Sequence, residues 1–259
     1  MLVDTHAHLS FPKFEKDLDA VITRANDAGV TCIVDVGTNL ETSLKAIALS
    51  ESVDGVYAAV GFHPADSIKA NDDALAQLPE LLNLEKVIAV GETGLDFFRD
   101  YAPLDVQEKS FRAHIHLAKA SNLPLIIHSR AAERRVLEVL QEEGAQDVGG
   151  VLHCFAGNAE QAQQAVDLNF HLGFGGIVTF KNSAALAVAL GVPGNRLILE
   201  TDCPFLAPVP KRGKRNEPAY VRFVAEYLAQ HGNLSFDRIC EQTTANATSL
   251  FGLGASCEG

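Results

Sequence analysis

Short apolar runs alternate with longer amphipathic segments along the whole 259-residue chain. The runs are rich in Val, Ile and Leu, which is typical of buried strands. The segments between them repeat apolar residues at helical spacing, as Leu18, Val21 and Ala25 do before Gly29, a suitable helix end. Strands are predicted at residues 2–9, 32–36, 56–60, 87–90, 123–127, 150–152, 171–174 and 197–199. Helices are predicted at residues 14–28, 42–50, 74–82, 104–120, 132–143, 159–168, 184–190 and 219–230.

These eight strand-helix units predict a closed (β/α)8 barrel of parallel strands, a TIM barrel. An open, doubly wound sheet is the alternative. The length and the 47% hydrophobic content suit a large core, and no low-complexity linker interrupts the chain. We therefore expect one domain spanning residues 1–259, with residues 237–251 forming an additional C-terminal helix outside the barrel.

The first predicted strand carries two histidines two residues apart. Because side chains alternate along a strand, His6 and His8 share a face with Asp4 and can grip one metal ion. Further ionisable residues follow other predicted strands at their carboxyl ends, where barrel enzymes keep their active sites. They are His63 after the third strand, Glu92 after the fourth, His128 after the fifth, His153 after the sixth and Asp202 after the eighth.

This set predicts a two-metal hydrolase. It contains more ligands than one tetrahedral zinc needs, whereas two ions about 3.5–4 Å apart could share a carboxylate and keep positions open for water. Glu92 is the expected bridge because it stands midway between the two histidine pairs, and Asp202 is expected to accept the proton of the attacking water. The predicted ligands of two zinc, manganese or magnesium ions are His6, His8, Glu92, His128, His153 and Asp202.

Neighbouring polar residues have competing interpretations. Asp4 and Glu200 each precede a predicted ligand by two residues, and we expect them to orient ligands or to sit in buried hydrogen-bond networks rather than to bind metal. His63 is open between a substrate contact and loop packing. Arg99 is open between a substrate contact and a surface ion pair.

The overall charge limits how a nucleic acid could bind. A net charge of −12 and a pI near 5.1 repel nucleic acid on average, so local cations or metal must hold an anionic substrate. A basic cluster follows the Asp202 loop, and we expect it to contact phosphate at the barrel mouth over a few nucleotides. The alternative is a solvated charge run. The cluster consists of Lys211, Arg212, Lys214 and Arg215.

The cysteines and the apolar runs bear on the cellular compartment. Five scattered cysteines without a Cys-x-x-Cys pair argue against a disulfide framework and a cysteine zinc site, so we expect reduced thiols. No apolar run approaches the roughly 20 residues of a membrane span, and the first motif begins without a signal segment. A cytoplasmic protein without a membrane partner is expected. The cysteines are Cys32, Cys154, Cys203, Cys240 and Cys257.

Seven short motifs follow one another along nearly the whole chain. They are VDTHAH at 3–8, GFHP at 61–64, GETGLD at 91–96, LIIH at 125–128, HCFAG at 153–157, ETDCP at 200–204 and RGKRNEP at 212–218. In this order they resemble the motifs of the TatD-type metal-dependent deoxyribonucleases, which belong to the amidohydrolase superfamily. The resemblance implies that the six predicted ligands bind metal in a (β/α)8 barrel.

The same resemblance implies hydrolysis of DNA phosphodiester bonds, commonly in the 3′ to 5′ direction, so single-stranded or frayed DNA ends are the expected partner. No lysine stands at the end of the fourth strand, so a carbamylated-lysine bridge is not available and Glu92 must serve. The superfamily also hydrolyses amides, lactones and phosphotriesters, and some TatD-like proteins look like deacylases of mischarged tRNA. An ester or amide hydrolase, such as a D-aminoacyl-tRNA deacylase, is therefore the alternative function. A barrel that binds metal without catalysis is a remote one.

Overall fold

Eight parallel strands form a barrel in the computed structural model, which describes residues 1–254 of the chain. Each strand pairs with the next one in the sequence. The ring closes beyond the last strand, where Cys203 C=O accepts the His8 N–H and His6 C=O accepts the Asp202 N–H, both at 2.8 Å. The predicted barrel is confirmed, and the open sheet is excluded. The strands are β1 (Leu2–Ala7), β2 (Val30–Val36), β3 (Val56–Val60), β4 (Val87–Asp96), β5 (Leu125–Arg130), β6 (Gly150–Leu152), β7 (Phe170–Phe174) and β8 (Leu197–Leu199).

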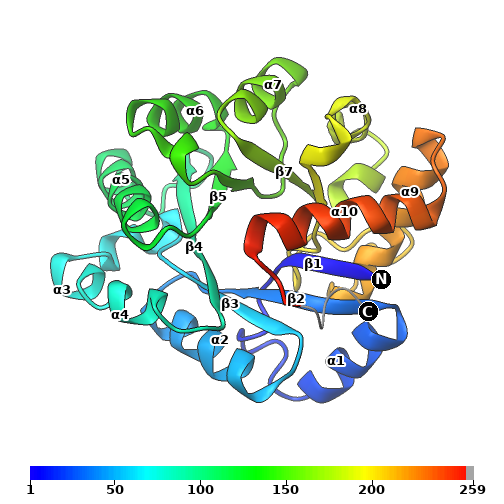
Figure 1. Ribbon diagram of the computed structural model, residues 1–259, viewed down its shortest axis with the longest axis horizontal. Coiled ribbons are helices and arrows are strands. Elements are labelled where there is room, and N and C mark those ends of the chain that lie inside the picture. Colours follow the sequence, from blue (N-terminus) through cyan, green and yellow to red (C-terminus); the bar gives the residue numbers. More distant parts are fainter. Residues whose placement is uncertain (255–259) are drawn as a thin grey trace.

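Helices surround the strands as an outer ring (Figure 1). The predicted helix at 14–28 begins only at Leu18, and the one at 74–82 is two short helices, the second with Pro79 in its first turn, where a missing N–H is tolerated. Within residues 1–254 none of the helices has the length and apolar character needed to cross a membrane. They are α1 (Leu18–Asp27), α2 (Leu40–Ser52), α3 (Asp72–Leu75), α4 (Leu78–Leu82), α5 (Leu104–Ser121), α6 (Glu133–Glu142), α7 (Ala159–Asp167), α8 (Ala185–Gly191), α9 (Val221–Gly232) and α10 (Phe236–Phe251).

Strand β4 is longer than predicted. It continues to Asp96, because Gly94 pairs with His128 and Asp96 with Arg130 on β5. The polar and glycine residues of this stretch obscure the strand pattern in the sequence. As a result Glu92 lies inside β4 rather than in the loop expected to follow it, at an irregular point of the strand where the pairing with β5 shifts register.

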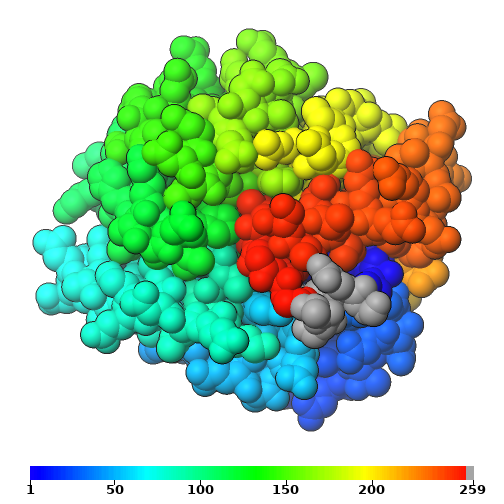
Figure 2. Space-filling model, viewed as in Figure 1, coloured from blue at the N-terminus to red at the C-terminus, as the bar shows by residue number. Residues whose placement is uncertain are grey.

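The last helix, α10, lies across the amino end of the barrel rather than in the outer ring (Figure 1). Asn246 on α10 donates to Leu197 C=O at 2.7 Å, and Thr244 donates to Met1 C=O at 3.3 Å, both at strand beginnings. Its buried residues Ala247 and Phe251 belong to the same apolar cluster as the strand residues that fill the barrel. The space-filling view shows α10, in red, over the middle of this face (Figure 2). The predicted C-terminal helix is thus a plug for the barrel interior.

The cysteines only partly match the expectation of reduced thiols. Cys154, Cys203 and Cys240 are free. Cys32 is disulfide-bonded, so the expectation is wrong for this residue. Cys257 lies outside the described residues.

Candidate metal centre and active site

The carboxyl ends of the strands bring the seven ionisable residues singled out above into one cluster. His6 lies in β1 and His8 just after it, and both are buried because the ends of the strands surround them. His63 begins the turn that follows β3, and His153 follows β6 directly. The cluster thus gathers residues that are up to 196 positions apart in the sequence, from His6 to Asp202.

Glu92 occupies the centre of this cluster. Its Oε1 atom lies 2.9 Å from His128 Nδ1 and 2.8 Å from His153 Nε2. Its Oε2 atom lies 3.4 Å from His6 Nε2 and 3.7 Å from His8 Nε2. Each carboxylate oxygen therefore faces a different histidine pair, which is the arrangement that a bridging carboxylate requires.

The first histidine pair is His6 and His8, and a backbone carbonyl orients His8 for metal binding. His8 Nδ1 lies 2.8 Å from Val36 C=O, and because a carbonyl can only accept, this nitrogen carries the proton. In the neutral ring the Nε2 lone pair is then available to a metal ion, and this atom lies 3.3 Å from His6 Nε2 and 3.4 Å from Asp202 Oδ1. Asp202 Oδ1 also lies 4.0 Å from His6 Nε2, so Asp202 adjoins this pair.

The second pair is His128 and His153, whose Nδ1 and Nε2 atoms lie 3.3 Å apart. His63 packs its ring 4.3 Å from that of His128 and places Nε2 3.8 Å from Glu92 Oε1. His63 Nδ1 accepts the Ala65 N–H at 3.0 Å, so in the neutral ring Nε2 carries the proton. In this tautomer His63 offers the site a hydrogen-bond donor rather than a ligand.

The carboxylates and imidazoles of the cluster shift one another's pKa values. Burial acts to raise the pKa of Glu92, but the neighbouring imidazoles outweigh burial and hold that pKa well below its usual range. Burial acts to lower the pKa of His153, but Glu92 and Glu200 raise it well above its ordinary value. Positive charge beside Glu92 therefore stabilises its ionised form.

Divalent cations fit this set of donors. In the part of the chain that the structure describes, no lysine or arginine forms an ion pair with Glu92 or Asp202. Nitrogen and oxygen atoms are the ligands that zinc and manganese accept. Three donor groups have all their ligand atoms within 4.8 Å of one another: His6, His153 and Asp202; His6, His8 and Glu92; and His63, Glu92 and His128.

Two buried carboxylates support the cluster from behind, as expected. Glu200 accepts the Cys154 N–H and lies 3.6 Å from His153 Nδ1. Asp4 accepts the Thr201 N–H at 2.8 Å and the Thr201 hydroxyl at 2.6 Å, and burial raises the pKa of Asp4 to about 8. Asp4 thereby joins the first strand to the segment that carries Asp202.

Three supporting residues were missed by the sequence reasoning. Asp96 lies 3.4 Å from His128 Nε2, and buried Asp35 accepts the Leu9 N–H at 2.7 Å, next to His8. Asn216 ties together the loop after Asp202, because its amide donates to Thr201 C=O at 2.8 Å and to Phe205 C=O at 2.7 Å. Asp96 and Asn216 stand within two of the quoted motifs, and Asp35 is an acid within an apolar strand. Those were the available signals.

The basic cluster is largely occupied by contacts within the protein. Arg215 forms a two-pronged ion pair with Asp17 at 2.7 and 2.8 Å. Arg212 stacks 3.8 Å from the centre of the Phe180 ring, and Lys211 lies over two further rings. Within residues 1–254, Lys214 alone of the four makes no such contact through its charged group. Phosphate contact by the cluster stays a prediction and rests mainly on Lys211, Arg212 and Lys214.

Arg99 is exposed in the loop after β4 and donates to the Tyr101 hydroxyl at 3.3 Å. Across the described chain Arg99 forms no ion pair, so the interpretation of Arg99 as half of a surface ion pair is wrong. Its role as a substrate contact stays a prediction.

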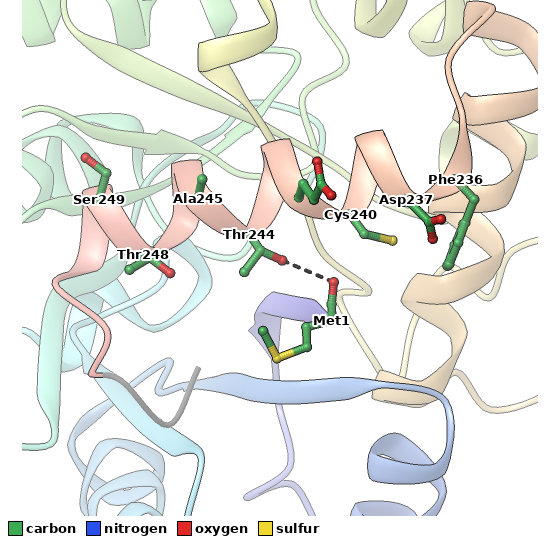
Figure 3. Close-up of a pocket in the computed structure, with 9 residues that line it drawn as sticks. Met1, Phe236, Asp237, Cys240, Thr244, Ala245, Thr248 and Ser249 are labelled. Carbon is green, nitrogen blue, oxygen red and sulfur yellow. Dashed lines mark hydrogen bonds between the residues drawn. The ribbon is translucent and has the colours of Figure 1, made fainter. Parts of the chain in front are cut away.

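A cavity of about 550 Å³ lies at the opposite end of the molecule, along α10. It is lined by Met1 and by one face of the helix, including Cys240 and Thr244 (Figure 3). This hollow is remote from the donor cluster, which lies at the carboxyl ends of the strands.

The barrel and the donor cluster at its carboxyl end together define a metal-dependent hydrolase. The chain belongs to the TatD family, because the sequence profile described as TatD related DNase matches residues 3–252.

Relatives match this chain over nearly their whole lengths. An uncharacterized metal-dependent hydrolase of Bacillus subtilis, YabD, is 49% identical over 97% of this chain and 99% of its own. A 3′-5′ ssDNA/RNA exonuclease, TatD of Cronobacter turicensis, is 34% identical over 98% of this chain and 99% of its own. The crystal structure of the TatD homologue YJJV of Escherichia coli superposes with a TM-score of 0.93 at 34% identity, covering 98% of both chains.

Proposed function

We propose that the protein is a two-metal phosphodiesterase that releases nucleotides from the 3′ end of single-stranded DNA or from frayed duplex ends. The position of Glu92 is the main support, because its two oxygens face separate histidine pairs. The name of the Cronobacter relative favours the same direction of attack. Residues 1–259 act in this proposal as one catalytic domain.

The donor cluster would hold the two ions side by side. When bound, divalent ions polarise the phosphoryl oxygen and lower the pKa of coordinated water towards about 7. Imidazole and carboxylate donors suit zinc and manganese, and magnesium less well. The proposed ligands are His6 and His8 on one side, His128 and His153 on the other, Glu92 between them and Asp202 beside the first pair.

Asp202 is the proposed proton acceptor for the attacking water. Its side chain is 14% exposed against 3% for Glu92, so it reaches the open side of the site. Burial acts to raise the pKa of Asp202, but hydrogen bonding to His8 and the nearby imidazoles hold it below its ordinary value. The carboxylate is thus ionised near neutral pH, as a general base must be.

His63 is the proposed hydrogen-bond donor to the substrate phosphate. Its Nδ1 atom is occupied by the Ala65 N–H, which leaves the Nε2 proton directed at the site. Burial lowers the pKa of His63 to about 4, so the ring donates as a neutral group. Further phosphate contacts are assigned to Arg99 and to the basic cluster.

The test is hydrolysis of a short single strand labelled at either end, by metal-free protein and by protein reloaded with zinc, manganese or magnesium. We expect activity only with metal and stepwise loss of nucleotides from the 3′ end. Asp202→Asn should fold normally and lose most of its kcat. Aminoacyl-tRNA and a dihydropyrimidine amide are assayed in parallel.

Three outcomes contradict the proposal. Activity that is indifferent to chelation rules out the metal mechanism, and release from the 5′ end or the interior rules out the 3′ exonuclease. Turnover of aminoacyl-tRNA or the amide without turnover of DNA makes the protein an amidohydrolase-type enzyme instead.

A further inference from the structure

The aromatic side chains that are most exposed to water gather in two loops at the carboxyl end of the barrel. Among the Phe and Tyr residues of the described chain, four are exposed by more than a third, and all four follow a residue of the site. Isolated exposed apolar residues are ordinary, but this concentration of rings around one site is not. The rings belong to Phe97, Phe98 and Tyr101 after β4 and to Phe205 after Asp202.

The loop after β4 is tied directly to the donor cluster. The backbone N–H groups of Phe98 and Arg99 both donate to Asp96 Oδ1 at 2.9 Å, while Asp96 Oδ2 lies 3.4 Å from His128 Nε2. The guanidinium of Arg130, two residues after His128, lies 4.2 Å from the centre of the Phe98 ring. Phe98 is nevertheless 62% exposed, so its ring keeps a free surface in the loop that Asp96 ties to His128.

The loop after Asp202 repeats this arrangement on the other half of the site. Phe205 N–H donates to Asp202 C=O at 2.9 Å, and the Phe205 ring meets the His8 ring edge-on with centres 6.3 Å apart. Lys13 places its ammonium 5.1 Å from the centre of the Phe205 ring. Phe11 stacks on His8 with ring centres 4.6 Å apart and supports this corner from within.

We infer that Phe98 and Phe205 are stacking platforms for the two bases that flank the scissile phosphate of a single-stranded nucleic acid. This inference rests on the proposed function. Exposed rings beside cations are the means by which proteins hold single strands without reading sequence, since every base has a flat π face. Arg130 and Lys13 then lie where the phosphates adjoining each stacked base pass. One platform on each half of the site holds the strand across the donor cluster.

Two consequences follow for the substrate. A base must leave its pair in order to stack on a protein ring, so duplex ends are attacked only when they fray. The platforms also explain how a chain of net charge −12 holds DNA, because stacking adds binding free energy that does not depend on neutralising phosphate.

The experiment compares a short single strand with the same strand carrying abasic tetrahydrofuran residues at its last two 3′ positions, so that charge is unchanged. For Phe98→Ala and Phe205→Ala we expect KM on the normal strand to rise about tenfold each, with kcat within about threefold. On the abasic strand, wild type should have a KM about as high as that of the alanine variants on the normal strand. Neither variant should have a higher KM than wild type on the abasic strand. Phe98→Tyr should keep KM near the wild-type value, because it keeps an aromatic ring. Phe98→Leu should raise KM as Phe98→Ala does. Leu234→Ala, an equally exposed apolar residue between α9 and α10, is the matched control and should change neither strand.

A second readout separates this inference from the proposed function. A strand with 2-aminopurine at its 3′ end should lose fluorescence on binding to metal-free protein, where no hydrolysis occurs, and Phe98→Ala and Phe205→Ala should weaken that quenching. Quenching by a wild type that hydrolyses no DNA with any metal overturns the proposed exonuclease and leaves the platforms standing. Equal losses on normal and abasic strands, or unchanged KM in both alanine variants, overturn the platforms while leaving the exonuclease standing.

Discussion

At the carboxyl end of the barrel, imidazoles and carboxylates are packed together, and within residues 1–254 the buried His6 Nδ1 atom has no hydrogen-bond partner. At the amino end, α10 lays Ala247 and Phe251 against apolar strand residues such as Val151. The first arrangement costs stability, because a buried polar atom without a partner loses its hydration. The second gains stability by burying apolar surface.

This contrast separates stability from chemistry within one barrel. The costly cluster lies at the end where the loops follow the strands, and the helix α10 covers the other end. The cavity of about 550 Å³ lies at the closed end, away from the donor cluster (Figure 3).

The largest expected effect comes from a substitution at the carboxyl end of the barrel that removes activity and leaves stability unchanged. Glu92→Ala should abolish binding of both metal ions and lower kcat/KM about a thousandfold or more, an effect of about 4 kcal/mol, without lowering the melting temperature. His6→Ala should mainly weaken one ion. Metal titrations by calorimetry on the two variants compare these losses, and equal loss in both would count against Glu92 as the bridge.

The next largest effect comes from a substitution at the amino end of the barrel that lowers stability and leaves activity unchanged. Phe251→Ala removes a nearly buried ring from the plug and should lower the free energy of unfolding by about 3–5 kcal/mol. Its kcat per folded molecule should equal that of wild type. Urea unfolding gives the free energy of unfolding, and metal-dependent turnover by the same preparation gives kcat. A large loss of kcat would show that the two ends are coupled.

A third prediction uses a buried histidine that belongs to neither end. His114 Nε2 accepts the Phe62 N–H at 3.0 Å, and burial lowers the pKa of His114 to about 4 from 6.5. Its unfolded form takes up a proton near pH 6.5, so its stabilising contribution is full above that pH and is lost as the pH falls towards 4, by about 3 kcal/mol.

His114→Gln keeps an acceptor for the Phe62 N–H but does not titrate. The unfolding free energy of this variant should therefore fall less than that of wild type between pH 7 and pH 4. Parallel stability curves for the two proteins would exclude His114 as the titrating group.

The smallest effect concerns the basic cluster. Each lost phosphate contact should flatten the log–log salt dependence of DNA binding by roughly 0.7 units. Replacing Lys211, Arg212 and Lys214 by alanine should flatten it by about two units and raise KM for DNA, while adding Arg215→Ala should change little more because Arg215 pairs with Asp17. Arg238→Ala, an exposed position on α10 at the amino end, serves as the control. Identical slopes in all proteins would identify the cluster as a solvated charge run.

The sequence by itself determined the barrel and the residues that line its carboxyl end. Alternating apolar runs specify strands, and a parallel barrel must place every strand's carboxyl end on one face, so His6, Glu92 and Asp202 could be grouped without coordinates. The cytoplasmic location and the number of ions stay predictions on the same basis.

Only the tertiary structure decided how these residues face one another. Side-chain direction at Glu92 depends on the pairing of β4 with β5, which a polar stretch conceals. The supporting contacts of Asp35 and Asp96 join separate strands and loops, and no local pattern encodes such a distance. The plug position of α10 was likewise undetermined, because an amphipathic helix needs an apolar surface but its sequence does not say which one. Periodicity is a local property of the chain, whereas contact is a property of the fold.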